Sequence, residues 1–376
     1  MMGEGFFGYS RSNGKVGIRN KIVVISSVVC ANTVARRVAE KIDNAVAITH
    51  PHGCGQIGRS FSNTFNILAG LGSNPNVYGA LVIGLGCENL FSTDLAEKIR
   101  ESKKPVESFN IQDIRGGTIG AIEKGIDICK EFDREAKKLN REFFDFSHIT
   151  LGLECGGSDA TSGLTANPTL GIVSDKLVNL GGTSILPEFA EWSGAVHLLS
   201  KRAINEEVAE KIKEPFKRFP GENRSPGNID GGLSTPEEKS LGNIAKAGKS
   251  PIQGVIKYTE KLGEEKGLWL MIEPGLDVVS MTALAAAGAN IIVFTTGRGT
   301  PFGSPVAPVI KICGNPKTCE YMANNFDIDA SKIITNNKTI EDISVLLWKK
   351  LKDVCNGEKT ISETLGFEED IGFWGG

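Results

Sequence analysis

The sequence has 376 residues, with 42 Lys plus Arg against 45 Asp plus Glu and a formal net charge of −3. Apolar residues make up 40% and charged residues 23%, which is ordinary for a globular chain and excludes a basic nucleic-acid-binding surface. No apolar run reaches the roughly 18 residues that span a bilayer, and the first residues lack the features of a signal peptide. We therefore expect a cytoplasmic protein of two or three domains, with neither nucleic acid nor membrane as a partner.

Short β-branched runs alternate with amphipathic stretches in the first 140 residues. This pattern predicts strands at 21–29, 45–50, 79–86 and 106–111, and helices at 32–42, 60–71, 93–102 and 117–140. Asn32 is the predicted N-cap of the first helix. Strands that alternate with helices of this length imply right-handed crossovers and a parallel sheet.

A second series of elements begins after the charged stretch 131–146. The predicted strands are 148–157, 183–189, 268–273 and 290–297, and the predicted helices are 167–179, 193–216, 280–289 and 340–355. We expect an α/β fold of two or three Rossmann-like layers with mostly parallel sheets. The expected domains are 1–145 and 146–376, and a polar stretch near 220–260 could divide the second.

Three predicted strands are followed by unusual loops, which begin at His50, Gly84 and Glu154. Ligands of an open parallel sheet bind at the carboxyl ends of its strands, and each of these loops carries one cysteine beside glycine. Eight cysteines in 376 residues are too dilute for a disulfide framework. We expect the three loop cysteines to converge on one inorganic site, and these are Cys54, Cys87 and Cys155.

Two kinds of iron site fit these loops. Three thiolates could hold an iron–sulfur cluster with one iron left open for substrate. Alternatively, His50, His52 and a carboxylate could hold a single Fe(II) with open positions for a hydroxy acid. The paired C-x2-C spacing of a structural zinc site is absent.

The loop 53–58 also matches G-x-G-x-x-G between a predicted strand and a predicted helix, as in dinucleotide-binding proteins. The acidic residue that should bind the ribose about twenty residues later is missing from 70–79. An NAD-dependent oxidoreductase is therefore a weaker alternative. A non-catalytic sugar-acid-binding subunit is another.

Polar and charged residues follow the later strands. The segment 154–168 is rich in hydroxyl and amide donors ahead of a predicted helix, which suits a carboxylate ligand, although these groups could simply cap the helix. Arg298 follows another strand between two glycines and could bind a carboxylate through two hydrogen bonds. The candidate substrate-binding residues are Ser158, Asp159, Thr165, Asn167, Thr296, Gly297 and Arg298.

Taken together, these motifs resemble the altronate and galactarate dehydratases, whose relatives include the large subunit of (R)-sulfolactate sulfo-lyase. The resemblance covers nearly the whole chain. The residues that carry it are Glu188, Glu191 and His197 and the sequence segments 8–20, 30–32, 52–56, 74–77, 84–88, 154–168, 225–235, 237–252, 294–303 and 326–331.

The resemblance implies an iron-dependent lyase that removes water from a sugar acid and gives a 2-keto-3-deoxy acid. Removal of the proton next to a carboxylate needs a cation, a base and an acid. Iron and Arg298 could supply the cation. His197 or His50 could act as the base, and Glu188 or Glu191 could act as the acid. With sulfolactate the leaving group would be sulfite and the product pyruvate.

The family also implies partners. Galactarate dehydratases carry an additional small N-terminal domain of the SAF type, and this sequence begins at about the point where the family's catalytic core begins. We therefore expect a separate small SAF-domain subunit. We also expect a homo-oligomer.

Overall fold

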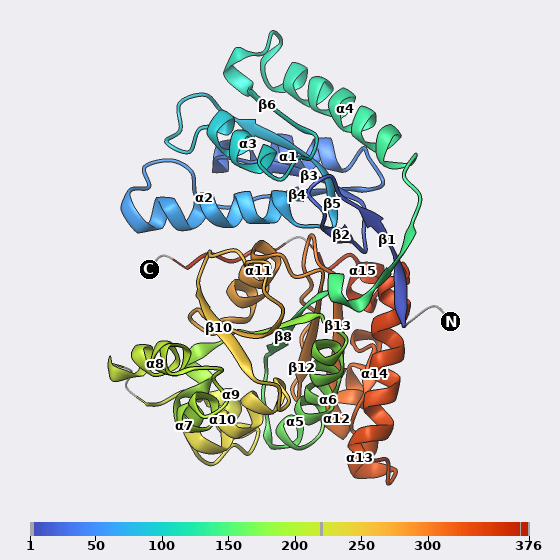
Figure 1. Ribbon diagram of the computed structural model, residues 1–376. Helices are drawn as coiled ribbons and strands as arrows, with labels where there is room; N and C mark the ends of the chain where they lie inside the picture. Colours follow the sequence, from blue (N-terminus) through green and yellow to red (C-terminus); the bar gives the residue numbers. More distant parts are fainter. Residues whose placement is uncertain (1–3, 219–220, 369, 375–376) are drawn as a thin grey trace.

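The computed structural model describes residues 4–218, 221–368 and 370–374. Two α/β units are stacked on one another, with the first unit at the top of Figure 1 and the second below it. Within the described residues, no helix is long and apolar enough to cross a membrane. The predicted α/β class with mostly parallel sheets is confirmed.

The first unit is built on a four-stranded parallel sheet with the order β4-β3-β5-β6. The strands are β3 (Lys21–Ser26), β4 (Ala45–Ile48), β5 (Val77–Gly84) and β6 (Val106–Asn110). Helices α1 (Asn32–Ala39) and α4 (Gly117–Ala136) share one apolar cluster with the sheet, and α2 (Gly58–Ser73) and α3 (Ser92–Arg100) share another. Because both faces are covered, Ile22, Val23, Val24 and Ile25 of β3 are fully buried.

The second unit contains a seven-stranded sheet in which every pairing is parallel, with the order β10-β11-β9-β8-β12-β13-β14. Its strands are β8 (Thr150–Cys155), β9 (Thr183–Leu186), β10 (Ile252–Lys257), β11 (Gly267–Ile272), β12 (Ile291–Thr296), β13 (Val309–Cys313) and β14 (Ile328–Asp329). Helices α6 (Ala166–Asn179) and α14 (Ile340–Cys355) cover one face, and α11 (Asp277–Ala287) covers the other. From β8 the chain first adds β9, β10 and β11 on one side and then crosses to β12, β13 and β14 on the other, so the strand order reverses between β8 and β12.

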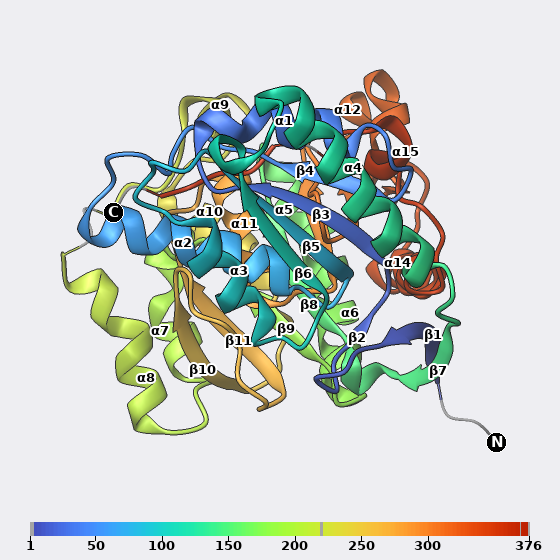
Figure 2. The same cartoon turned by 90° about the horizontal axis from the view of Figure 1, so that it is seen from above.

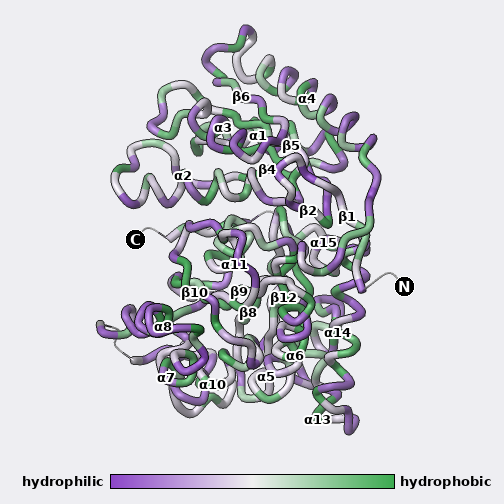
Figure 3. Tube along the Cα trace, in the orientation of Figure 1, coloured by the Kyte–Doolittle hydropathy of each residue, from purple (hydrophilic) through white to green (hydrophobic). Residues whose placement is uncertain are grey.

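The remaining elements are short. A third, antiparallel sheet has the order β2-β1-β7 and lies at one side of the molecule (Figure 2). Its strands are β1 (Gly5–Ser10), β2 (Val16–Gly17) and β7 (Glu142–Asp145), and the other helices are α5 (Ala160–Leu164), α7 (Val196–Ser200), α8 (Glu206–Lys213), α9 (Pro226–Asp230), α10 (Pro236–Ala245), α12 (Pro316–Tyr321), α13 (Lys332–Thr335) and α15 (Ile361–Leu365). Figure 3 shows α4 alternating between hydrophobic and hydrophilic residues along its length, as a helix with one covered face does.

Two local predictions are wrong. The predicted helix 193–216 is interrupted between α7 and α8, because the Asn205 side chain caps α8 and Ala203 forms a β-bridge with Ile252. Asn32 does not cap α1. Its amide donates to the His50 carbonyl oxygen at 2.9 Å and accepts from the Ser26 hydroxyl, so it ties the ends of neighbouring strands together.

Candidate active site

The most unusual cluster of side chains lies at the carboxyl end of the seven-stranded sheet. Cys155 is the last residue of β8, and its side chain is buried at the point where the strand order reverses. Reversal of the connections leaves a crevice between the loops that follow β8 and β12, which is where open α/β sheets bind ligands. The fold therefore places this thiol at the position expected for a site.

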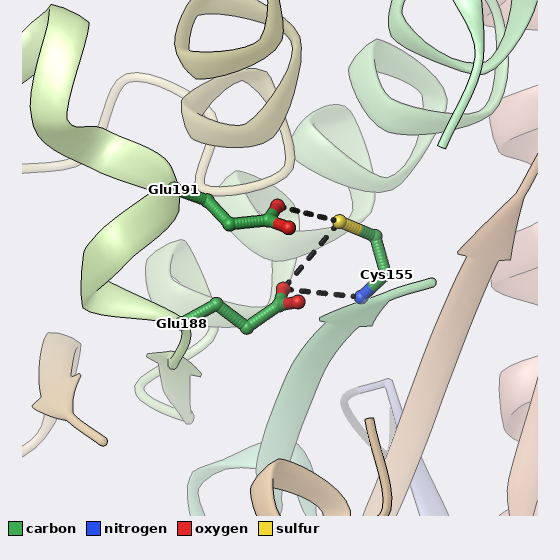
Figure 4. A group of neighbouring side chains, drawn as sticks. All are labelled: Cys155, Glu188 and Glu191. Atoms are coloured by element: carbon green, nitrogen blue, oxygen red, sulfur yellow. Dashed lines mark hydrogen bonds between the residues drawn. The ribbon is translucent and has the colours of Figure 1, made fainter. Parts of the chain in front are cut away.

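Two glutamates from the segment after β9 meet this thiol (Figure 4). The Cys155 Sγ lies 3.4 Å from Glu188 Oε2 and 3.4 Å from Glu191 Oε2, and the Cys155 backbone N–H donates to Glu188 Oε2 at 3.3 Å. Glu188 adopts a left-handed backbone conformation, with φ 65° and ψ 53°. Such a conformation costs a non-glycine residue about 1–3 kcal/mol, so the surrounding contacts must hold Glu188 in this place.

One face of α10 completes the cluster. Lys246 Nζ lies 2.6 Å from Glu188 Oε2, and Lys239 Nζ lies 2.7 Å from Glu191 Oε1. Between them, Asn243 donates to Glu191 Oε2 at 2.7 Å. Residues at spacings of four and three lie on the same side of a helix, which is why these three side chains reach the site together.

Further buried acids surround this group. Glu273 follows β11 and accepts from the backbone N–H of Glu188 and, at 2.8 Å, from the Ser280 hydroxyl. Asp277 begins α11, and Glu154 precedes Cys155 on β8. The cluster thus holds five carboxyl groups and a thiol but only two lysines, within the part of the chain that the structure describes.

Burial controls the protonation of these acids. It raises the pKa of Glu188, and the neighbouring Glu191 carboxylate raises it further. Burial also raises the pKa of Glu273 to about 7 and that of Asp277 to about 6. The Cys155 thiol shows the same upward shift of its pKa, caused first by burial and then by the charge of Glu188. A bound cation would reverse these shifts.

The cluster adjoins a pocket of about 260 Å³. Lys239 and Asn243 line it from α10, and Ser158 lines it from the loop after β8, where its hydroxyl lies 3.6 Å from Cys155 Sγ. Asp159 and Asn167 are also in the wall. This pocket therefore connects a binding space for a small molecule to the buried thiol and carboxylates.

The predicted substrate-binding residues lie after two different strands, β8 and β12, and the residues after β8 come first. Ser158, Asp159 and Asn167 line the pocket beside the cluster, although Asp159 is also the N-cap of α5 and accepts from the Ser162 N–H at 2.8 Å. The Thr165 hydroxyl donates to the Thr161 carbonyl oxygen at 2.7 Å and so serves the local helix turn.

The segment after β12 lies beside a second pocket. The Thr296 hydroxyl accepts from the Gly299 N–H at 2.8 Å, and Gly297 packs so closely on Asp159 that a side chain there would collide with it. Arg298 is exposed, donates to the Gly227 carbonyl oxygen at 3.1 Å and lines a pocket of about 500 Å³ that also contains Asp159. The structure therefore does not bring Arg298 to the cysteine.

The predicted histidines lie apart from the cluster. Both ring nitrogens of His50 are occupied, since Nε2 lies 2.8 Å from the Ser26 carbonyl oxygen and Nδ1 accepts from the His52 N–H at 3.1 Å. The His52 ring stacks near that of His50 and meets the Phe373 ring edge-on. His197 is exposed on α7. The structure assigns none of the three to the group around Cys155.

The three predicted cysteines do not form one group in this structure. Cys155 is buried at the edge of the second sheet, whereas Cys54 and Cys87 are exposed in loops of the first. Among the described residues, the sets of potential ligands whose atoms lie within 4.8 Å of one another are Cys155 with Glu188 and Glu191, and Glu154 with Glu188 and Asp277. The expected convergence of thiols is replaced by one thiol among carboxylates.

Sequence reasoning missed the α10 residues and the surrounding acids. Lys239, Asn243 and Lys246 recur at helical spacing within a segment that had been noticed only for its resemblance. Polar residues at spacings of four and three mark one helix face, and that signal was available. Glu273 and Asp277 follow β11 as Cys155 follows β8, so they also lie at a carboxyl edge.

Comparison with known proteins identifies the family of this chain. The D-galactarate/altronate dehydratase C-terminal family matches residues 146–375, and the second domain of the D-galactarate dehydratase/altronate hydrolase family matches residues 8–137. Altronate dehydratase of Bacillus subtilis is 37% identical over 97% of this chain and 76% of its own length. The chain belongs to the galactarate and altronate dehydratase family.

Two further members of the dehydratase family differ in how much of their length is matched. The (2R)-sulfolactate sulfo-lyase subunit beta of Chromohalobacter salexigens is 36% identical over 99% of this chain and 97% of its own length. Galactarate dehydratase of Escherichia coli is 35% identical over 98% of this chain and 76% of its own length. The altronate and galactarate dehydratase relatives indicate a carbon–oxygen lyase and favour a lyase over the oxidoreductase and binding-subunit alternatives.

The residues present in this dehydratase-family chain fit a metal ion. Glu188 Oε2 and Glu191 Oε2 converge on Cys155 Sγ, and Asn243 Oδ1 beside them is buried without a hydrogen-bond partner in the described part of the chain. A thiolate combined with carboxylates is a mixed ligand set that transition metals accept. The cluster is therefore a candidate metal site.

Proposed function

We propose that the chain removes water from a sugar acid such as altronate or galactarate and gives a 2-keto-3-deoxy acid. The observation that carries the proposal is the joining of Cys155, Glu188 and Glu191 to a pocket whose wall contains Lys239. Such a substrate presents a carboxylate, which needs a cation, and a C2 proton, which needs a base. Both are available within one hydrogen-bonded group.

Iron is the metal that we propose for this group, with Cys155, Glu188 and Glu191 as the residues that would hold it. When bound, iron would stabilise the negative charge that develops next to the substrate carboxylate. The chemistry of the ligand set supports a single iron more than an iron–sulfur cluster, because one thiol is present among the potential ligands.

The chain's own residues can carry the proton. Glu191 Oε2 faces Cys155 and Asn243, whereas Oε1 faces Lys239 on the pocket side. Glu191 Oε1 would accept the C2 proton and return it to the departing hydroxyl, so that the substrate loses one proton and one hydroxide as water. Lys239 would bind the substrate carboxylate, and the Ser158 hydroxyl would bind a substrate hydroxyl.

A second candidate reaction is the cleavage of (R)-sulfolactate to pyruvate and sulfite. It is favoured by the sulfo-lyase subunit beta, which this chain matches over 97% of that protein's length. Sulfite is a good leaving group and does not need the proton that Glu191 returns in a dehydration. The same pocket and the same base would serve both reactions.

We also propose a separate small SAF-domain partner. The relative that matches nearly end to end is named as a subunit, and the dehydratases have about a quarter of their length outside the match. A homo-oligomeric assembly and a cytoplasmic location remain predictions from the sequence.

The test is anaerobic purification of the chain, with iron and sulfide analysis and assays on hexonates, hexarates and (R)-sulfolactate. Formation of a 2-keto-3-deoxy acid supports the dehydratase, and release of sulfite with pyruvate supports the second candidate. Glu191→Gln should abolish the reaction, whereas Glu142→Gln on the exposed strand β7 should not. Absence of turnover on all three classes, with iron bound and the small subunit added, would overturn the proposal.

A further inference from the structure

Glu154 is buried in a way that the chain itself does not explain. It precedes Cys155 on β8, and neighbouring side chains of a strand point to opposite faces of the sheet. The side chain is 0% exposed, and neither Oε1 nor Oε2 has a hydrogen-bond partner in the described part of the molecule. A carboxyl group buried in this way is costly unless a proton or a cation neutralises it.

Two other carboxylates meet Glu154. Potential ligand atoms of Glu154, Glu188 and Asp277 lie within 4.8 Å of one another. Glu188 Oε1 is a second buried oxygen without a partner, whereas Glu188 Oε2 is the atom bound by Lys246. Gly156 makes this approach possible, because any side chain there would collide with the Asp277 carboxylate.

The positive charges nearby are already engaged on the other side. Lys246 pairs with Glu188, and Lys239 pairs with Glu191. No lysine, arginine or histidine of the described residues lies within 4.0 Å of a Glu154 or Asp277 oxygen. Glu154 and Asp277, which lack such a partner, are costly to bury beside Glu188 unless another cation is present.

We propose that Glu154, Glu188 and Asp277 form a second cation site, distinct from the group of Cys155, Glu188 and Glu191. Its ligands are all carboxylate oxygens, which favour a hard divalent cation such as Mg²⁺, Mn²⁺ or Ca²⁺ over a metal that prefers sulfur. Glu188 belongs to both groups and bridges them. The inference rests on the proposed function only in that it takes the first group to be a metal site.

A bridging carboxylate gives Glu188 a reason for its strained backbone. Its two oxygens must point to two sites at once, and the left-handed conformation with φ 65° directs the side chain between β8 and α10. The second cation neutralises Glu154 and fixes Glu188, which in turn fixes the first group. Glu154 is therefore a ligand residue that the sequence alone does not distinguish from the rest of the cysteine loop.

Mn²⁺ binding to the full chain tests the proposal. After removal of metals with a chelator, Mn²⁺ is added anaerobically, the bound metal is measured by mass spectrometry, and the electron paramagnetic resonance spectrum is recorded. Wild-type protein should bind two Mn²⁺ per chain with spin coupling between them. Glu154→Gln should bind one and lose the coupling, with at least a tenfold weaker affinity for the second ion.

Three variants keep the test decisive. Asp277→Asn should reproduce the effect of Glu154→Gln, and it serves if Glu154→Gln does not fold. Asp327→Asn changes another buried aspartate, which accepts from the Lys311 N–H and lies outside both groups, and it should leave two ions bound. Cys155→Ser should retain the all-oxygen site.

The opposite results are equally clear. One Mn²⁺ per chain, unaffected by Glu154→Gln and Asp277→Asn, would overturn the proposal. Two bound Mn²⁺ without spin coupling would overturn the bridging role of Glu188. Loss of lyase activity on every substrate while both ions bind would count against the proposed function and leave this site standing.

Discussion

Both parallel sheets bury a glutamate at the carboxyl edge, and the two glutamates have opposite surroundings. Glu88, in the first unit, accepts from the Ser27 hydroxyl at 2.8 Å and from the backbone N–H groups of Leu85 at 3.0 Å and Gly86 at 2.6 Å. Burial would raise the pKa of Glu88, but these hydrogen bonds lower it below its ordinary value. It is an ionised carboxylate whose partners are two backbone N–H groups of its own loop and the Ser27 hydroxyl after β3.

Glu188, in the second unit, lacks this local support. Its Oε2 depends on Lys246 from another helix, its Oε1 has no partner among the described residues, and its pKa is raised by burial. The difference separates a structural carboxylate from a candidate functional one. Two glutamates at carboxyl edges carry different roles because one is satisfied by local donors and the other is left for a ligand.

The largest effect expected from this difference is on stability. Lys246→Met leaves the Glu188 charge buried without its cation, which should lower the free energy of unfolding by roughly 3–5 kcal/mol. Chemical denaturation measures it. The matched variant Glu88→Gln should lower the free energy of unfolding by less, about 1–3 kcal/mol, because only hydrogen bonds change. Equal losses of unfolding free energy in the two variants would show that Glu88 and Glu188 do not differ in this way.

The second expected effect concerns the thiols at the two edges. Cys155→Ser should reduce kcat/KM by at least about a hundredfold, because it removes the sulfur around which Glu188 and Glu191 converge. Cys54→Ser and Cys87→Ser are matched controls on the first edge, where both thiols are exposed. Losses of the same size in all three variants, together with loss of iron, would support the cluster that the sequence suggested.

The third expected effect is a pH dependence of stability that comes from His50, at the carboxyl edge of the four-stranded sheet. Burial lowers the pKa of His50 to about 4 from an ordinary 6.5, so the unfolded chain binds more protons between these values. Stability should therefore rise as the pH increases from about 4 to 6.5, by at most about 3 kcal/mol from this group. His50→Gln should show a smaller rise over the same range in denaturation series. An unchanged slope would show that His50 is not the group responsible.

The smallest expected effect is that of Arg298→Lys. The arginine is exposed and lies beside a pocket that adjoins the cluster, so it can bind only the distal part of a substrate. We expect KM to rise about tenfold, with kcat nearly unchanged. Lys317→Met, in the wall of the same pocket, tests whether any cation there has this effect. A large fall in kcat would instead show that Arg298 acts at the reacting atoms of the substrate.

Much of the fold could be predicted because its strands are buried on both faces and read as β-branched runs. The strand β10 was missed because Gln253 and Gly254 interrupt its apolar pattern. The strand β7 was missed because its charged surroundings continue the pattern of α4. Both are decided by contacts with distant strands, which local propensity does not encode.

The site residues could likewise be predicted only in part from the sequence. Cys155, Glu188 and Glu191 could be selected because they follow strands, and the structure brings them together. The sequence could not show that both nitrogens of His50 are occupied by backbone groups, since those partners come from the fold. The expected domain boundary already placed Cys54 and Cys155 in different units, but the sequence could not show that the two carboxyl edges keep these thiols apart, because that depends on how the units pack.

The contact between α2 and α11 has a consequence for how the whole chain unfolds. One apolar cluster extends from Val23 and Ile25 of β3, through these two helices, to Ile292 and Phe294 of β12. At Gly70 the helices approach so closely that any side chain would collide with Ala286. Neither unit can lose its helix layer without exposing the apolar surface of the other. Heating should therefore melt both halves in a single cooperative transition, and calorimetry should record one peak.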